Sequence, residues 1–383
     1  MVASGISTID RCVSARYSQC QQHKIQFDSD ETRLVAHGDD FTFLGTSVAL
    51  EEVLAHFRRW WDIKLRGILG SDPEDSKEIE ILNRKLTWDG NKLILKADNK
   101  HAEVLWAELG IRENSNGISI PINEADDKGS ETVLDKSEAS RYRSLAARVN
   151  YLGLDRPDLQ YATKKICQEM ANPTASGMAR LKRVARYLVN APEGHLIYDS
   201  KVVDMSTLKV YVDSDWAGCK ATRKSTSGGL AVWAGGVVKS WSRTQGTIAL
   251  SSGEAEFYAA LKGIAEGLGL RSLMQDMGVA VKVEVVQDST SAKGTLSRSG
   301  IGKIKHLDTN WLWVQEVVKT RGVQLIKIDG AINPADVLTK PTSFQDVNRR
   351  MQTRAGYEVI SRRGWSKESG VATVTKFLRN QGN

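Results

Sequence analysis

Four carboxylates in the second half of the chain occupy positions from which they could converge. Asp213 ends the predicted strand LKVYVD, and Asp288 ends the predicted strand VEVVQD. Glu256 lies one turn into a predicted long helix, and Asp336 opens the last predicted helix. Strand ends and the starts of helices packed over them are where α/β sheets build their sites. A cluster of this kind would suit phosphodiester hydrolysis, in which two magnesium ions about 4 Å apart activate a water and stabilise the leaving oxygen.

The spacing of these acids leaves alternatives open, because a single Asp or Glu is a solvated surface charge in roughly nine cases of ten. Asp215 follows Asp213 by two and could assist it, but its place beyond the last apolar pair of the strand favours a role in the turn. Glu254 has the spacing of a capping box with Ser251. We therefore predict that Glu256 joins the cluster, on a helix face whose other members are small: Ala259, Ala260, Gly263 and Gly267.

The elements that must position these acids form a mixed α/β layer structure. Strand patterns at LKVYVD, LAVWAGG and VVKSWS, with a turn at Gly235-Gly236, predict three adjacent antiparallel strands, and TIALS predicts a further one. The remaining elements are expected to be a long helix from Ser252 to Met274, a strand from Lys282 to Gln287, a short helix, a Trp-rich helix from Asp308 to Lys319, a strand from Gln324 to Ile328, and a helix from Pro334 with Asn333 as its N-cap.

The first part of the chain predicts a second, α+β unit. Two apolar runs flank Gly38-Asp39-Asp40, which is the pattern of a β-hairpin with acidic residues at its tip. Helices are expected from Leu50 to Trp61 and from Lys100 to Leu109, and a second hairpin turns at Asp89-Gly90. The polar segment 114–137 has no sustained periodicity, so we expect an exposed linker there.

The segment 138–200 predicts two or three basic helices. Between Arg141 and Asn190 there are ten basic residues and three acidic ones, a surplus equal to the net charge of +7 of the whole chain. Basic helices are usually solvated faces, but this concentration favours a surface that follows a nucleic-acid backbone. The residues expected to make that surface lie on one helix: Arg180, Lys182, Arg183 and Arg186.

Composition narrows the class of protein. A length of 383 residues suits two or three domains, and 41% hydrophobic with 26% charged residues argues against a largely disordered chain. The four cysteines have neither metal-site nor disulfide-scaffold spacing. No apolar run is long enough for a membrane span, and the first residues lack a signal-peptide core, so we expect no membrane partner and an intracellular protein.

Five sequence motifs show a resemblance to a known family. In order they are VYVDSDWAGC, RKSTSGGLAVWAGGVVKSWSRTQGTIALSSGEAEFYAAL, VVQDSTSAKG, IKHLD and NPADVLTKP, and together they resemble the ribonuclease H domain of copia-type retrotransposon Pol polyproteins. Upstream, AHGDDFTFLG resembles the catalytic hairpin of the reverse transcriptase of the same elements. The similarity runs from about Val35 to Pro341.

The resemblance implies a domain plan, a chemistry and a location, which would be cytoplasmic, in virus-like particles, or nuclear. It implies a partial reverse transcriptase with palm hairpin and thumb at 1–113, the linker at 114–137, a basic helical connection at 138–200, a ribonuclease H domain at 201–342 and a basic tail at 343–383. The expected fold is α/β, a ribonuclease H-like mixed five-stranded sheet with helices, after an α+β palm and thumb remnant. The implied substrate is an RNA/DNA hybrid, and the implied ligands of two Mg²⁺ ions, or Mn²⁺, are Asp213, Glu256, Asp288 and Asp336. His306 could contact a substrate phosphate, although a lone histidine at a helix entry is more often structural.

The polymerase half departs from the family pattern. Asp39 and Asp40 match the paired catalytic acids, but polymerisation also needs an aspartate from an earlier strand and the fingers, and thirty-eight residues precede Asp39. We therefore expect no RNA-directed DNA polymerase activity unless another chain supplies the missing part. The alternative to a nuclease is a non-catalytic nucleic-acid-binding remnant of a decayed or co-opted retroelement.

Overall fold

The computed structural model describes residues 11–17, 32–112, 114–123, 132–201, 204–300 and 313–362. These residues form two compact units. The first unit contains the described residues of 11–98, 196–340 and 350–357, and the second contains those of 99–195, 341–349 and 358–362. The predicted catalytic carboxylates all lie in the first unit.

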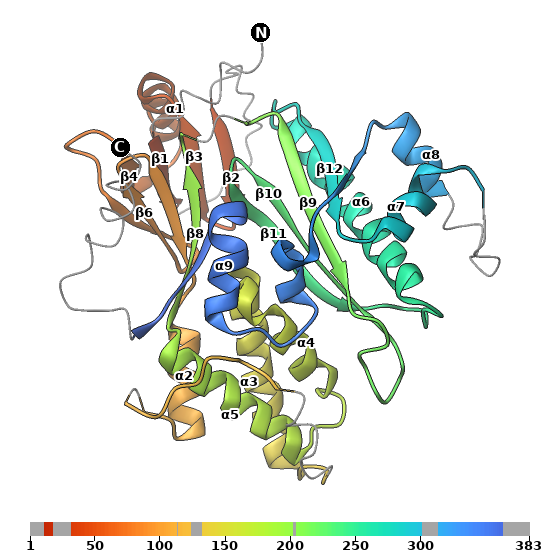
Figure 1. Ribbon diagram of the computed structural model, residues 1–383. Helices are drawn as coiled ribbons and strands as arrows, with labels where there is room; N and C mark the ends of the chain where they lie inside the picture. Colours follow the sequence, from red (N-terminus) through yellow and green to blue (C-terminus); the bar gives the residue numbers. More distant parts are fainter. Residues whose placement is uncertain are drawn as a thin grey trace, which may run out of the picture. The chain divides into compact units, whose positions relative to one another are not determined.

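A five-stranded mixed sheet is the centre of the first unit (Figure 1). Its order is β11-β10-β9-β12-β13, with β9, β10 and β11 antiparallel and β12 parallel to both β9 and β13. The strands are β9 (Thr207–Ser214), β10 (Thr226–Trp233), β11 (Gly236–Thr244), β12 (Lys282–Gln287) and β13 (Gln324–Lys327). This arrangement confirms the predicted five-stranded α/β sheet.

Helix α6 (Ser252–Asp276) packs against β9, β10 and β12. Its predicted small-residue face allows a close approach, because a Cβ added at Gly263 would lie 2.4 Å from Cγ1 of Val212. A Cβ added at Gly267 would lie 2.8 Å from Cγ1 of Val283. The shorter helices α7 (Thr290–Ser297) and α8 (Trp313–Thr320) complete this layer, and 308–312 of the predicted Trp-rich helix lie outside the described residues.

Two predictions for this region are wrong. TIALS does not form a strand: Trp216 Nε1 donates to the carbonyl of Ala249 at 3.1 Å, and Leu250 N donates to Glu254 at 2.8 Å, so side chains take the bonds of a sheet partner. The helix expected from Pro334 is a short 3-10 helix, η5 (Pro334–Leu338). Its predicted N-cap is confirmed, since Asn333 Oδ1 accepts from Ala335 N at 3.1 Å.

The N-terminal part of the first unit contains a four-stranded sheet of order β2-β3-β1-β4. The predicted acidic hairpin is formed by β2 and β3, and Phe43 packs with Phe57 of α1 in its core. The elements are β1 (Arg11–Tyr17), β2 (Arg33–His37), β3 (Asp40–Gly45), α1 (Ser47–Trp60) and β4 (Ile63–Gly70). The second predicted hairpin also forms, in a five-stranded sheet of order β14-β8-β7-β6-β5. Its strands are β14 (Tyr357–Ile360), β8 (Glu193–Asp199), β7 (Lys92–Lys96), β6 (Arg84–Asp89) and β5 (Glu78–Ile81).

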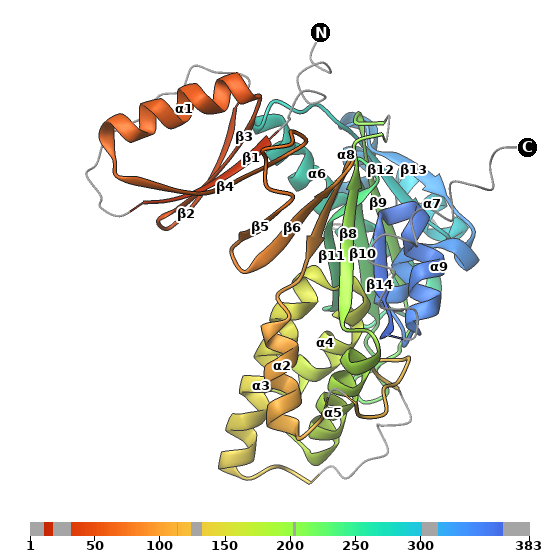
Figure 2. The ribbon, with the colours of Figure 1, turned by 90° about the vertical axis from the view of Figure 1, so that its left-hand side faces the viewer.

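The second unit is helical, as Figure 2 shows for α2 to α5. Residues 114–123 depart from the predicted open linker, because Ile118 N donates to Arg186 O and Arg183 Nε donates to Ile120 O, each at 3.3 Å. Its helices are α2 (Lys100–Leu109), α3 (Lys136–Asp155), α4 (Gln160–Gln168) and α5 (Ala175–Asn190). The last elements of the described residues, α9 (Phe344–Ala355) and β14 (Tyr357–Ile360), are each divided between the two units. Among the helices of the described ranges, none has the length and apolar character of a bilayer span.

The close contact between α6 and the sheet leads to a test with two glycines of one helix. Gly263→Ala should destabilise the fold by about 1–3 kcal/mol, because the new methyl overlaps the β-branched side chain of Val212. Gly269→Ala is the control: nothing lies within 4 Å of its added Cβ, so the better helix propensity of alanine should stabilise by about 0.5–1 kcal/mol. Urea unfolding of both variants measures the difference, and equal effects at the two positions would contradict the packing described.

Candidate active site

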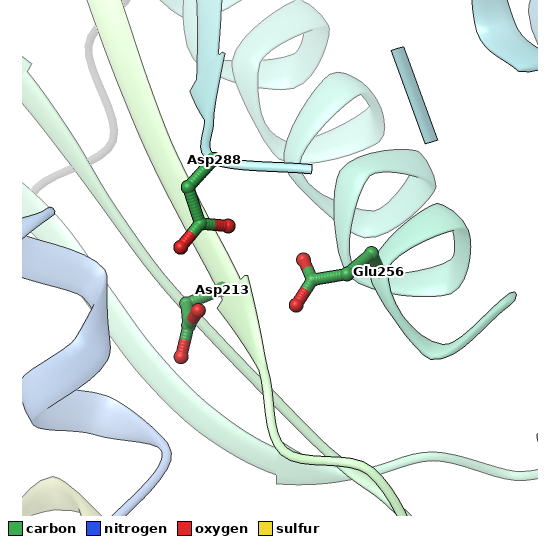
Figure 3. Close-up of side chains that lie close together, drawn as sticks. All are labelled: Asp213, Glu256 and Asp288. Atoms are coloured by element: carbon green, nitrogen blue, oxygen red, sulfur yellow. The ribbon is translucent and has the colours of Figure 1, made fainter. Parts of the chain in front are cut away.

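Three of the four predicted carboxylates meet at one edge of the mixed sheet. Asp213 lies near the end of β9, Asp288 follows β12 directly, and Glu256 comes from the second turn of α6. Each offers one oxygen to a group whose members all lie within 4.8 Å of one another, and Figure 3 shows the side chains turned toward a common centre. Within the described part of the chain, no other acids, histidines or cysteines gather in such a group.

Strand register brings the two aspartates together. Strands β9 and β12 run parallel, and Val286 pairs with Tyr211. Each of the two aspartates lies two residues beyond its member of this pair, on the same side of the sheet edge. Proximity of Asp213 and Asp288 is therefore a direct consequence of parallel pairing.

The capping of α6 selects which glutamate faces them. Ser251 is the N-cap, and its hydroxyl accepts from Glu254 N at 3.2 Å. The Glu254 carboxylate accepts from Leu250 N at 2.8 Å and from the Tyr258 hydroxyl at 2.9 Å. The predicted capping role of Glu254 is confirmed, and Glu256 is the one that reaches the two aspartates.

The neighbours of Asp213 hold the strand end in place. Thr339 donates its hydroxyl hydrogen to Asp213, and Asn333 Nδ2 donates to the carbonyl of Val212 at 3.0 Å. Asp215 accepts from the hydroxyl of Thr226 at 2.9 Å and from the backbone of the same residue. As predicted, Asp215 shapes the turn after β9 and belongs to the scaffold of the site.

Burial and mutual repulsion disfavour ionisation of the cluster. Burial, with the charges of Asp336 and Asp288, raises the pKa of Asp213 to about 7, although the hydrogen bond from Thr339 opposes this. Burial, with the charges of Asp213 and Asp288, raises the pKa of Glu256 to about 8. Burial and the charge of Asp336 also raise the pKa of Asp288. A positive charge placed among these three carboxylates would favour their ionised forms and lower their pKa values again.

The oxygens of the cluster fit a hard divalent cation. Glu256 Oε1 accepts from Ser214 N at 3.3 Å, but Glu256 Oε2 is buried and receives no hydrogen bond. A buried carboxylate oxygen without a donor is costly unless a cation takes the place of the donor. Oxygen ligands from several carboxylates are the set that Mg²⁺ and Mn²⁺ prefer. The donor set is therefore compatible with the predicted metal site.

Asp336, the fourth predicted ligand, is close to the cluster but lies outside the group of three. It is only 7% exposed, and its Oδ2 pairs with Arg350 Nη2 at 3.0 Å while its Oδ1 pairs with Lys340 Nζ. Sequence reasoning missed both cations. The four-residue spacing between Asp336 and Lys340 could have indicated the first, but no local pattern connects Asp336 with Arg350 of α9.

The predicted polymerase acids lie at the tip of the hairpin of β2 and β3. Asp39 is exposed at the turn, and Asp40 pairs with Arg66 of β4 at 3.4 Å. No other acid, histidine or cysteine of the described ranges joins them in a group of three. The structure therefore shows the hairpin, but no assembled metal site around it in those ranges.

The predicted basic face of α5 divides into two parts. Lys182 and Arg186 are exposed, and Arg183 is partly buried. Arg180 must be removed from the face, because it is 9% exposed and forms an ion pair with Glu169, roughly on the other side of the helix. His306, the remaining predicted substrate contact, lies outside the described residues.

Comparisons with known proteins found similar sequences among retrovirus-related Pol polyproteins of transposons. No family model matches the chain. The Retrovirus-related Pol polyprotein from transposon TNT 1-94 of Nicotiana tabacum is 30% identical over 214 residues, which are 55% of this chain and 16% of that polyprotein. The chain thus spans less than a fifth of the length of this curated relative.

Two solved structures have low identity to the chain. The foamy viral protease-reverse transcriptase in complex with dsDNA is 14% identical, with a TM-score of 0.47, over 78% of this chain and 55% of that one. LC11-RNase H1, isolated from compost, is 17% identical, with a TM-score of 0.27, over 35% of this chain and 94% of that one.

The raised pKa values predict how stability depends on pH without metal. Asp and Glu in an unfolded chain ionise near pH 4, whereas Asp213 and Glu256 hold their protons to about pH 7 and 8. Over this window the folded state binds more protons than the unfolded state, so the free energy of unfolding in EDTA should fall as pH rises from 5 to 8.5. Glu256→Gln should reduce the fall, because it removes one of the groups that bind a proton in the folded state. Urea titrations at several pH values measure the fall, and equal slopes in the parent and Glu256→Gln would rule out Glu256 as a source.

Proposed function

Because this chain belongs to the copia-type retrovirus-related Pol polyproteins of transposons, we propose that its region 201–342 is a ribonuclease H domain that cuts the RNA strand of RNA/DNA hybrids. The observation that carries the proposal is the group of Asp213, Glu256 and Asp288, with oxygens within 4.8 Å on a five-stranded mixed sheet. Family membership and geometry support a nuclease role independently of each other. Beyond the nuclease role, we propose that the substrate is an RNA/DNA hybrid and that two metal ions take part in catalysis.

The proposed metal ligands are Asp213, Glu256, Asp288 and Asp336. When bound there, two Mg²⁺ ions would lower the pKa of a water and stabilise the charge that develops on the leaving oxygen of the RNA. The chain itself supplies position and charge. Parallel pairing of β9 and β12 fixes the aspartates, and the capped helix α6 fixes Glu256, so little rearrangement is needed when a phosphate arrives.

Substrate binding would depend on basic residues outside the carboxylate cluster. We assign a backbone-contacting role to the exposed Lys182 and Arg186 of α5, with Arg183 beside them. Contacts of this kind follow phosphates and carry no sequence preference. Arg180 is left out of this surface because of its ion pair with Glu169.

One substitution tests the proposal most simply. Asp288→Asn keeps the shape of the side chain but removes one of the clustered charges, so cleavage of a labelled RNA/DNA hybrid in Mg²⁺ should fall by several orders of magnitude, while the parent cuts the hybrid and spares single-stranded RNA. Glu284→Gln, in the strand β12 that Asp288 follows, is the matched control and should keep the parental rate.

The alternative of a non-catalytic nucleic-acid-binding remnant gives a different result in the same assay. In that case the parent binds the hybrid without cutting it, and Asp288→Asn changes nothing. Equal cleavage by parent and Asp288→Asn would instead place the nuclease activity elsewhere.

A further inference from the structure

Asp336 differs from the other three acids in having two cationic partners. Arg350 lies on helix α9, beyond residue 342, where the nuclease domain was predicted to end. Its guanidinium reaches three acceptors of one short segment: Asp336 Oδ2 at 3.0 Å, the carbonyl of Gly330 at 2.9 Å and the carbonyl of Asn333 at 3.3 Å. The side chain of Arg350 is only 14% exposed.

The segment that Arg350 holds also borders the carboxylate cluster. A Cβ added at Gly330 would lie 2.7 Å from Asp288 Oδ2, and Asn333 donates to the carbonyl of Val212, next to Asp213. The hydroxyl of Thr339 connects the end of the segment to Asp213, and its oxygen also lies 3.1 Å from the carbonyl oxygen of Asp336, so the two acceptors share one hydroxyl hydrogen. Arg350 therefore determines where Asp336 stands relative to Asp213 and Asp288.

The two cations on Asp336 have different physical characters. Arg350 is largely buried and bonded to rigid backbone acceptors, and such charge-assisted, multidentate contacts are strong. The Lys340 side chain is 55% exposed, and an ammonium on a flexible stem in such a setting contributes little net stability to an ion pair. A divalent cation competing for the same carboxylate would displace Lys340 far more readily than Arg350.

The residue that follows α9 is also packed closely. Gly356 has φ +56°, and a Cβ there would lie 2.3 Å from the carbonyl of Ile197 and 2.6 Å from that of Gly235. Ile197 N donates to the carbonyl of Gly356 at 2.7 Å. Together with the complete burial of Met351 and Ala355, these contacts fix the helix turn that carries Arg350.

We propose that Arg350 is a positioning residue, which holds Asp336 through Oδ2 as the fourth metal ligand, and that Lys340 is an exchangeable counter-ion, which occupies Oδ1 until a divalent cation arrives. This inference rests on the proposed function, because it deepens the same site. It assigns to α9 a part in metal binding. The domain boundary predicted from sequence, at residue 342, had placed this helix outside the nuclease domain. It also separates the two neighbouring cations, because loss of Arg350 should weaken metal binding and loss of Lys340 should not.

The test is titration of the full chain with Mn²⁺, with the heat of binding recorded by calorimetry. Arg350→Met keeps the aliphatic stem but removes the charge, and it should raise the Mn²⁺ Kd on the order of 10- to 100-fold, as losses of partners behind metal ligands do. Arg350→Lys should restore part of the affinity. Lys340→Met removes a competitor, so it should leave the Kd unchanged or lower it a few-fold.

A double variant distinguishes positioning from a general structural role. If Arg350 acts through Asp336, the double variant Asp336→Asn/Arg350→Met should bind Mn²⁺ no more weakly than the single variant Asp336→Asn. If the two residues act independently, their losses of Mn²⁺ affinity should add. Additive losses, an unchanged Kd in Arg350→Met, or weakened binding in Lys340→Met would each overturn the inference. Lys340→Met changes an exposed side chain, so this arm remains decisive even if Arg350→Met fails to fold.

Cleavage of the hybrid is recorded on the same samples to separate the two proposals. If Mn²⁺ affinity responds as stated but no variant nor the parent cuts the hybrid, the nuclease function fails and the positioning role of Arg350 stands. If the parent cuts the hybrid and Mn²⁺ affinity is indifferent to Arg350, the positioning role fails and the nuclease function stands.

Discussion

Repulsion among buried and partly buried carboxylates is the constraint on which the rest of the structure depends. Asp213, Glu256 and Asp288 bring oxygens within 4.8 Å of one another, and burial raises the pKa of all three. A fold whose only requirement was stability would separate such groups or pair them. Here the surrounding protein pairs the fourth acid, Asp336, with two cations and leaves Glu256 Oε2 without a donor. The cluster is therefore a candidate site for divalent cations.

The scaffold offsets this cost through strand pairing and apolar packing around the site. Parallel pairing of β9 with β12 aligns two strand ends, and a glycine and alanine face lets α6 approach close enough for Glu256 to reach them. The core beneath the site is formed by fully buried side chains such as Val210, Val212 and Phe257. The energy that stabilises the crowded acids thus comes from burial of apolar area in the same sheet and helix.

Much of this could be predicted from sequence, because the signals are local. Alternating strands, the hairpin turns and the capping box of Ser251 with Glu254 each depend on residues a few positions apart, and they distinguished Glu254 from Glu256. What failed depends on tertiary contacts. Arg180 has the same type and spacing as its exposed neighbours, but its direction around α5 places it against Glu169. Nothing in the local sequence around Arg350 predicts a contact with the nuclease site, so its ion pair with Asp336 is found only in the three-dimensional structure.

The most direct test of the central claim is anomalous X-ray diffraction from crystals of the chain soaked in MnCl₂. The account predicts manganese peaks among Asp213, Glu256, Asp288 and Asp336, with Arg350 still bonded to Asp336 and Lys340 moved away. Crystals that diffract well and contain no manganese at these carboxylates, or in which Asp336 keeps both of its cations beside bound metal, would contradict it.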